Sequence, residues 1–173
     1  MKFEKAKAED HSPIKNFYWK LIDEMQSEND KIGWKKGIYP SDDYLMHSLA
    51  NGELYKLTND DKMYACVILN SVSNEGYNGV QWSIDCKENE VLIPHALAVA
   101  PSEQGQGIGT QLVNEIIRFA RSEAKKAIRL DILGTNMSAE KLYMKCGFRF
   151  VEAKQLFYED TGLTEYKMYE FKL

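Results

Sequence analysis

Long apolar runs, proline-rich linkers and an excess of positive charge are all missing from this 173-residue chain. A membrane-spanning helix needs about 20 consecutive apolar residues, and no run reaches that length, so we expect no membrane partner. Lysine and arginine number 22 against 26 acidic residues, and this formal net charge of −4 argues against a nucleic-acid partner held by bulk charge. The charged N-terminus lacks the apolar core of a secretory signal, so we expect a cytoplasmic protein.

Cysteine and histidine are also scarce, with three residues of each type. An odd number of cysteines without a CxxC spacing argues against a disulfide framework, and we interpret them as free thiols. The histidines show no metal-ligand spacing, so no metal is expected. The residues concerned are Cys66, Cys86, Cys146, His11, His47 and His95.

No repeat or low-complexity tract divides the chain, so we expect one domain over residues 1–173. Hydrophobic periodicity predicts helices at 12–25, 41–51, 108–124 and 138–145, and strands at 53–58, 62–70, 91–99, 128–133, 148–158 and 165–173. Ser12 is the expected cap of the first helix, and a turn at 59–61 is expected to close a hairpin. This order indicates a mixed α/β or α+β layer fold.

Three alternating glycines separate the strand at 91–99 from the amphipathic helix that follows. Gly105, Gly107 and Gly109 allow backbone conformations that other residues disfavour, and they leave room for close approach of a ligand. The first turn of the helix adds unpaired N–H groups and the positive end of the helix dipole. The segment therefore predicts a cradle for an anion such as a phosphate or pyrophosphate.

Three known phosphate-binding loops compete for this segment. A Walker loop requires a lysine after its last glycine, where Thr110 stands. A dinucleotide fingerprint also lacks its third glycine at Thr110 and would need Asp131 as its acidic residue, so that match is poor but stays open. The acyl-coenzyme A loop, Gln/Arg-x-x-Gly-x-Gly/Ala, is matched at every fixed position by Gln104, Gly107 and Gly109.

Two further segments extend this match. The chain reads Leu97-Ala98-Val99-Ala100-Pro101 before the loop, and an Asn-x-x-Ala-x-x-x-Tyr-x-x-x-Gly-Phe element follows at 136–148. Over residues 91–151 the chain resembles the GCN5-related N-acetyltransferase (GNAT) family. The resemblance implies a central, mixed, mostly antiparallel and splayed sheet of six to seven strands, flanked by about four helices.

The resemblance also implies transfer of an acetyl group from acetyl-CoA, as co-substrate, to a primary amine of a small molecule or peptide. The alternatives are an acyl-CoA-binding sensor or structural module without turnover, and a transferase that uses another acyl-CoA or a protein N-terminus. The strand-like run at 165–173 can pair across a homodimer.

The family likeness assigns acetyl-CoA binding to the loop, to the strand before it and to the element at 136–148. In family members the pantetheine arm pairs with the strand, where the Val99 N–H is the expected oxyanion donor. Asn136 resembles the residue that bonds this arm, although it or Ser138 can equally cap the next helix. The expected cofactor-binding residues are Leu97, Ala98, Val99, Gln104, Gly105, Gln106, Gly107, Ile108, Gly109, Thr110, Asn136, Tyr143 and Lys145.

Two residues are candidates for proton transfer. A lysine-like amine with a pKa near 10.4 costs roughly 4–5 kcal/mol to deprotonate at neutral pH, so a proton acceptor is needed. His95 is the candidate base, expected on the same strand face as Leu97 and Val99; a hydrogen-bonded core histidine or a water chain is the alternative. Tyr143 resembles the family's general acid to the thiolate, and core packing is its alternative.

The acceptor pocket has the weakest signal. Trp34, Tyr39 and Trp82 lie in predicted loops, which often carry substrate specificity, although each can simply cover the core. We expect these three residues to bind the acceptor.

Overall fold

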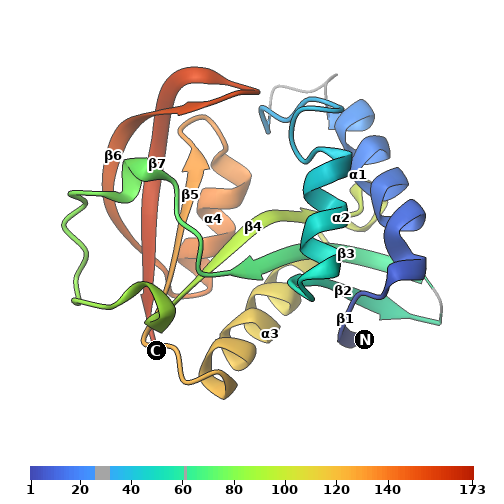
Figure 1. The fold of residues 1–173 in the computed structure, drawn as a ribbon, viewed down its shortest axis with the longest axis horizontal. Helices are drawn as coiled ribbons and strands as arrows, with labels where there is room; N and C mark the ends of the chain where they lie inside the picture. Colours follow the sequence, from blue (N-terminus) through green and yellow to red (C-terminus); the bar gives the residue numbers. More distant parts are fainter. Residues whose placement is uncertain (26–31, 61) are drawn as a thin grey trace.

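The computed structural model describes residues 1–25, 32–60 and 62–173 of the chain. Its helices and strands are interspersed along the sequence (Figure 1). In chain order they are β1 (Lys2–Lys5), α1 (His11–Met25), α2 (Asp42–Ala50), β2 (Leu54–Asn59), β3 (Lys62–Asn70), β4 (Val91–Val99), α3 (Ile108–Ser122), β5 (Ala127–Leu133), α4 (Met137–Lys145), β6 (Arg149–Tyr158) and β7 (Gly162–Lys172).

The strands form one seven-stranded sheet in the order β1-β2-β3-β4-β5-β7-β6. Neighbouring strands are antiparallel except β4 and β5, which are parallel and joined through α3. A mixed, mostly antiparallel sheet with four α-helices in the described residues confirms the predicted fold class. A doubly wound dinucleotide fold would need a mostly parallel sheet, so that interpretation of the glycine loop is wrong.

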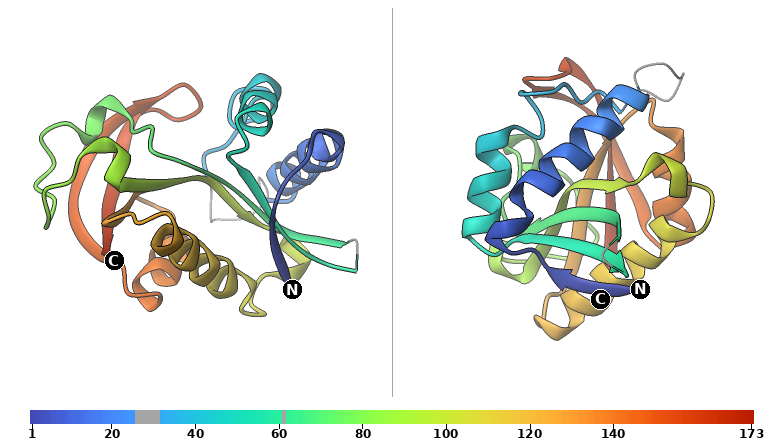
Figure 2. Two further views of the ribbon diagram at one scale, coloured as in Figure 1. Left: turned by 60° about the horizontal axis from the view of Figure 1, so that its bottom comes forward. Right: turned by 90° about the vertical axis from the view of Figure 1, so that its right-hand side faces the viewer.

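Each face of the sheet carries one pair of helices (Figure 2, left). α1 and α2 enclose a core that includes Ile14, Leu45 and Ile68. α3 and α4 cover the other face, where Leu112 and Tyr143 belong to a second core cluster. The apolar stripe of α3 repeats every three to four residues, and this spacing turns its buried side toward the sheet.

The predicted elements all form, and three details differ. β1 has no counterpart in the prediction, because this short edge strand is charged and only partly buried. α1 begins at His11 and not after a Ser12 cap, because a 3₁₀ turn at Ala8–Asp10 leads directly into it. The predicted turn at 59–61 includes Asp61, which lies outside the described residues.

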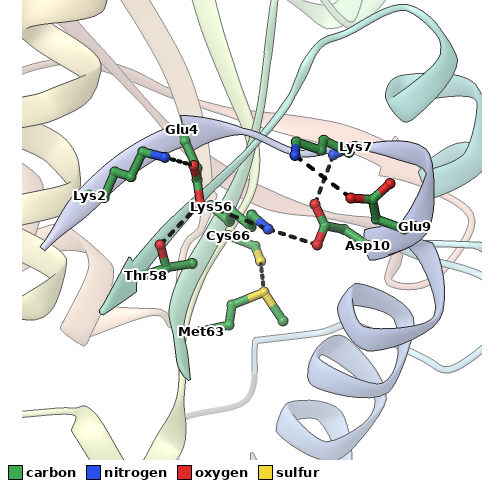
Figure 3. A network of polar contacts seen from close by, with 9 residues as sticks. All are labelled: Lys2, Glu4, Lys7, Glu9, Asp10, Lys56, Thr58, Met63 and Cys66. Atoms are coloured by element: carbon green, nitrogen blue, oxygen red, sulfur yellow. Dashed lines mark hydrogen bonds and ion pairs between the residues drawn. The ribbon is translucent and has the colours of Figure 1, made fainter. Parts of the chain in front are cut away.

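A polar network fastens β1 and the following turn to β2 (Figure 3). The Lys56 ammonium lies 2.7 Å from a carboxylate oxygen of Asp10 and 3.9 Å from one of Glu4. The Thr58 hydroxyl donates to Glu4 at 3.2 Å, and the Lys7 N–H donates to Asp10 at 2.8 Å. Both carboxyl groups have pKa values below their usual range. The Lys2 hydrogen bond is the main cause of the lowered pKa at Glu4. At Asp10, burial alone would raise the pKa, but the hydrogen bonds and charges of Lys56 and Lys7 together lower it.

Among the helices of the described residues, none combines the length and the apolar character that crossing a membrane requires.

Candidate active site

β4 and β5 diverge along the sheet (Figure 1), so their facing edges are unpaired over most of their length, and we call this unpaired stretch the opening. They pair only at Val91↔Ala127 and Leu92↔Ile128, whereas β4 stays paired with β3 as far as Val99. The Ala100 N–H donates to Tyr64 on the β3 side at 2.8 Å. Because N–H groups of successive strand residues point to opposite edges, the Val99 N–H points into the opening.

A β-bulge in β4 decides which side chains face which helices. His95 lies opposite Ile68 and Ala98 lies opposite Cys66, so β4 holds one extra residue, and Ala96 takes a positive φ of 49°. This extra residue reverses the alternation of side chains. His95 therefore shares a face with Ala98, and the prediction that it lies on the same face as Leu97 and Val99 is wrong.

The glycine loop lies at the start of α3. Gly105 and Gly107 have φ values of 77° and 82°, and a Cβ at either position would meet no protein atom within 4 Å. Gly107 caps α3, whose first turn contains no acidic residue. A Cβ on Gly109 would lie 3.1 Å from Leu142, so this glycine lets α3 and α4 pack closely. The open space and the unpaired N–H groups fit a pyrophosphate.

One cavity of about 790 Å³ joins the loop, the opening and both faces of the sheet. Its size is in the range of small-molecule sites. Gln106 and Ile108 do not line it: the Gln106 amide donates to Ser102 at 3.1 Å, and Ile108 is buried in the core. The predicted residues that do line it are Trp34, Tyr39, His95, Leu97, Ala98, Val99, Gln104, Gly105, Gly107, Gly109, Thr110, Asn136, Tyr143 and Lys145.

Trp82 does not line this cavity, unlike Trp34 and Tyr39. The guanidinium carbon of Arg129 lies 4.5 Å from the centre of the Trp82 ring, beside a smaller hollow. Arg129 is buried and pairs with Glu170 at 2.9 Å. Trp82 thus covers a buried ion pair, and the expectation that it joins Trp34 and Tyr39 is corrected.

Asn136 is the N-cap of α4. Its side-chain oxygen accepts a hydrogen bond from the Ala139 N–H at 3.0 Å, whereas Ser138 lies within the first turn. The cap leaves the amide NH₂ of Asn136 as a donor at the wall of the cavity. Asn136 can therefore cap α4 with its side-chain oxygen and contact a ligand with its NH₂ group.

Tyr143 is buried on α4, with its ring 5.2 Å from that of Phe148. Burial, and then the nearby charge of Asp131, raise the pKa of Tyr143 well above its usual value, so the hydroxyl keeps its proton at neutral pH. Lys141 and Lys145 lie one turn apart on the same helix and line the cavity. Lys141 was not among the predicted site residues, although its spacing of four residues from Lys145 places both side chains on one face of the helix.

His95 is held by its neighbours. Its Nε2 lies 2.9 Å from the side-chain oxygen of Asn70, which also accepts from the Val72 N–H at 3.0 Å. An oxygen that accepts from a backbone N–H requires Nε2 to be the donor in the His95 contact. Burial lowers the pKa of His95 to about 4, against a smaller opposing effect of the Val72 backbone, so the ring is neutral at physiological pH.

The cavity wall also contains a carboxylate that was not among the predicted site residues. Asp131 on β5 accepts hydrogen bonds from the hydroxyls of Tyr77 and Tyr158. Asp160 and Tyr166 line the same part of the cavity. The available signal was a lone acid within an otherwise apolar strand end, which we considered only as part of a dinucleotide site. Across the three described ranges, no group of His, Cys, Asp or Glu could hold a metal ion.

Comparisons with known proteins agree with this architecture. An acetyltransferase of the GNAT family from Streptococcus agalactiae 2603 has a TM-score of 0.83 at 15% identity, covering 99% of this chain and 95% of that one. The yncA structure from Salmonella typhimurium, solved with its cofactor acetyl-CoA, has a TM-score of 0.73 at 15% identity, covering 100% and 94%. At these identities the likeness concerns the fold.

Sequence relatives add the family assignment. The chain is 34% identical to the N-alpha-acetyltransferase RimI of Mycobacterium tuberculosis over 74 residues, which is 43% of this chain and 45% of that protein. The chain therefore matches less than half the length of this curated relative. A sequence model of the acetyltransferase (GNAT) family matches residues 18–148, and the chain belongs to that family.

Proposed function

We propose that this protein transfers the acetyl group of acetyl-CoA to a primary amine of a small molecule or peptide. One observation carries the proposal: a glycine loop at a helix N-terminus, an unpaired strand edge and a buried tyrosine all line one cavity. These three features suit the anionic end, the extended arm and the thioester of acetyl-CoA, respectively. In this proposal residues 1–173 act as one domain, with the acetyl-CoA-binding part at 91–151.

The binding roles follow from the geometry. The N–H groups from Gly105 to Thr110, with the positive end of the α3 dipole, hold the pyrophosphate, and Lys141 and Lys145 add positive charge at the cavity. Gln104 was also among the expected cofactor-binding residues, but its N–H donates to the Pro101 carbonyl at 3.3 Å instead. The free edge of β4 at Leu97 and Val99 supplies backbone hydrogen bonds to the pantetheine arm. Acetyl-CoA, when bound, supplies an acyl group that is already activated as a thioester.

Tyr143 donates the proton that the departing thiolate needs. Its hydroxyl keeps this proton at neutral pH because burial raises its pKa. No hydrogen bond within the described residues occupies this hydroxyl, so it is available to a ligand in the cavity. The Val99 N–H, which points into the opening, stabilises negative charge that develops on the carbonyl oxygen.

His95 is left out of the proposed mechanism. A general base works best with a pKa near the operating pH, and burial lowers the pKa of His95 to about 4. Its contacts with Asn70 and the Val72 backbone also hold the ring in a fixed position, which is a structural role. These contacts support the core-histidine alternative. In this proposal a water chain takes the proton that the amine nitrogen loses as its bond to the acetyl carbon forms, while the carbon–sulfur bond breaks and Tyr143 protonates the departing sulfur.

Two measurements on the purified protein test the proposal. Calorimetry reports the binding of coenzyme A, and a thiol reagent reports release of coenzyme A from acetyl-CoA over a panel of amines. We expect binding and amine-dependent thiol release. Binding without thiol release for any amine would favour the sensor alternative, and absence of binding would overturn the proposal altogether.

A further inference from the structure

A carboxylate stands in the part of the cavity that faces α1, α2 and β6. The Tyr77 hydroxyl donates to Asp131 Oδ1 at 2.7 Å, and the Tyr158 hydroxyl lies 3.1 Å from both Oδ1 and Oδ2. A carboxylate has about four acceptor sites, and Oδ2 takes part in one shared bond only. Oδ2 therefore keeps the capacity to accept further hydrogen bonds from a ligand.

This carboxylate has no cationic partner in the part of the chain described here. None of the ion pairs in residues 1–25, 32–60 and 62–173 includes Asp131. An enclosed carboxylate without a counter-ion is costly, and two neutral hydroxyls offset only part of that cost. Burial accordingly raises the pKa of Asp131, against the opposing effect of the two tyrosine hydrogen bonds. A bound cation would supply the missing charge.

Aromatic rings surround the same space. Trp34, Tyr39 and Tyr44 form a chain of ring contacts with centroids 5.7 Å apart at each step. Tyr158 and Tyr166 pack with centroids 4.8 Å apart on the β6–β7 side. All five rings line the cavity. Aromatic faces attract organic cations and also pack against apolar groups, so such walls favour a ligand that combines both.

From this arrangement we propose that Asp131 and the surrounding rings form the acceptor subsite, and that this subsite selects a small organic ammonium with an apolar or aromatic body. The ammonium donates to Oδ2 of Asp131, and the body lies against the rings. Asp131 is thus a specificity-determining residue for the acceptor. This inference rests on the proposed function, because it names the amine that the transferase would take.

The subsite also separates opposite charges within one cavity. Lys141 and Lys145 lie on α4 beside the proposed coenzyme A site, whereas Asp131 and Asp160 lie on β5 and in the β6–β7 turn. An anionic cofactor and a cationic acceptor are therefore directed to different ends. A neutral acceptor would gain only a weaker, neutral hydrogen bond from Asp131.

Calorimetry with two probes tests the subsite. Phenethylamine carries an ammonium near neutral pH, and 2-phenylethanol replaces that group with a hydroxyl of similar size. The titrations use the full chain saturated with coenzyme A, so that no reaction takes place. A charge-assisted hydrogen bond corresponds to about tenfold or more in affinity, so we expect the amine to bind at least about tenfold more tightly than the alcohol.

The Asp131→Asn variant should reduce this preference to about twofold or less while coenzyme A affinity stays unchanged. Asp85→Asn is the matched control. Asp85 is exposed and lies beside the smaller hollow, and its substitution removes the same charge outside the cavity. Should Asp131→Asn fail to fold, Asp131→Glu displaces the carboxylate by one methylene, and we expect it to weaken the amine but not the alcohol.

Equal affinity of the wild type for the amine and the alcohol would overturn the inference. An Asp131→Asn variant that still prefers the amine as strongly as the wild type would also overturn it. Where Asp131→Asn does not fold, the same result in Asp131→Glu would do so. The proposed function fails by different readouts, namely absence of coenzyme A binding or absence of thiol release. The two failures are therefore distinguishable.

Discussion

The cavity has two halves that differ in charge and in construction. The cofactor half consists of the strand end, the glycine loop and α4, all within residues 97–145, and its charged side chains are lysines. The proposed acceptor half includes Trp34, Tyr39, Tyr44, Tyr77, Asp131, Tyr158, Asp160 and Tyr166, and its acidic side chains are Asp131 and Asp160. A contiguous segment with local backbone geometry forms the first half, whereas distant side chains converge to form the second.

This difference indicates how each half can vary. In the proposed function, backbone N–H groups and glycine conformations bind the part of acetyl-CoA that is the same for every acceptor, so the cofactor half needs specific residues at few positions. Side chains contributed by loops and strand ends determine the acceptor half, so substitutions there change specificity without disturbing the cofactor. Substitutions in each half should therefore affect one ligand and leave the other unchanged.

The largest effect is expected from Gly107→Glu in the cofactor half. The substitution places a negative charge in the open space before α3, where the pyrophosphate is proposed to lie, and forces a side chain onto a positive φ. We expect coenzyme A affinity to fall by at least about 100-fold, since like charges at short range repel by several kcal/mol. Calorimetry measures this directly.

Gly79→Glu is the matched control for that substitution. Gly79 has a φ of 78°, and a Cβ there also meets no atom within 4 Å, but it lies outside the cavity. The Gly79→Glu substitution introduces the same backbone strain and the same charge at a position outside the cavity. Equal loss of coenzyme A affinity in both variants would contradict the placement of the pyrophosphate.

Tyr143→Phe is expected to have the next largest effect. Phenylalanine keeps the packing against Phe148 but removes the hydroxyl. We expect kcat to fall by about 100-fold, the lower end for loss of a general acid, with coenzyme A affinity and stability unchanged. Steady-state kinetics with saturating substrates measures kcat. A variant with full turnover would remove Tyr143 from the mechanism.

Asp131→Asn should weaken acceptor binding and leave acetyl-CoA binding unchanged. We expect KM for phenethylamine to rise about tenfold and KM for acetyl-CoA to stay constant, because the lost interaction is a charge-assisted bond to the acceptor. Initial rates at varied concentrations of each substrate separate the two constants. A rise in KM for acetyl-CoA of equal size would show that the two halves are not independent.

His95→Gln should have the smallest effect on activity, with turnover at neutral pH nearly unchanged. Its effect lies in the pH dependence of stability. The folded-state pKa is about 4 and the unfolded value about 6.5, so the unfolded chain binds more protons between these values. Stability is therefore full above the unfolded pKa and falls as pH drops toward 4, by about 2–3 kcal/mol from this residue.

Denaturant unfolding of wild type and His95→Gln at neutral and at mildly acidic pH measures that difference. The variant should lose less stability on acidification than the wild type. If instead the acidic limb of the rate profile disappears in the variant while stability changes equally in both proteins, His95 is the base after all.

The cofactor half could be predicted from the sequence, because it depends on the backbone conformation of neighbouring residues. Gly105 and Gly107 have the positive φ values that a loop of alternating glycines predicts, and α3 starts where the apolar stripe begins. The same reasoning predicted the strands around this loop and their order. Asn136 was ambiguous between cap and ligand contact because one amide can serve both purposes.

The acceptor half could not be predicted from the sequence, because it depends on contacts between residues that are far apart along the chain. The bulge at Ala96 moves His95 to the other face, and alanine carries no signal for a positive φ. The sequence places Tyr77, Asp131 and Tyr158 far apart, and only the folded sheet brings their side chains together. Trp82 was misplaced for the same reason, because its partner Arg129 lies 47 positions further along the chain.

Release of the coenzyme A thiol from acetyl-CoA, with phenethylamine as acceptor, is the most direct test of the account. We predict amine-dependent release by the wild type, with Gly79→Glu active and Gly107→Glu inactive. Wild-type protein that binds coenzyme A but releases no thiol with phenethylamine or any other amine of the panel would contradict the proposed acetyl transfer.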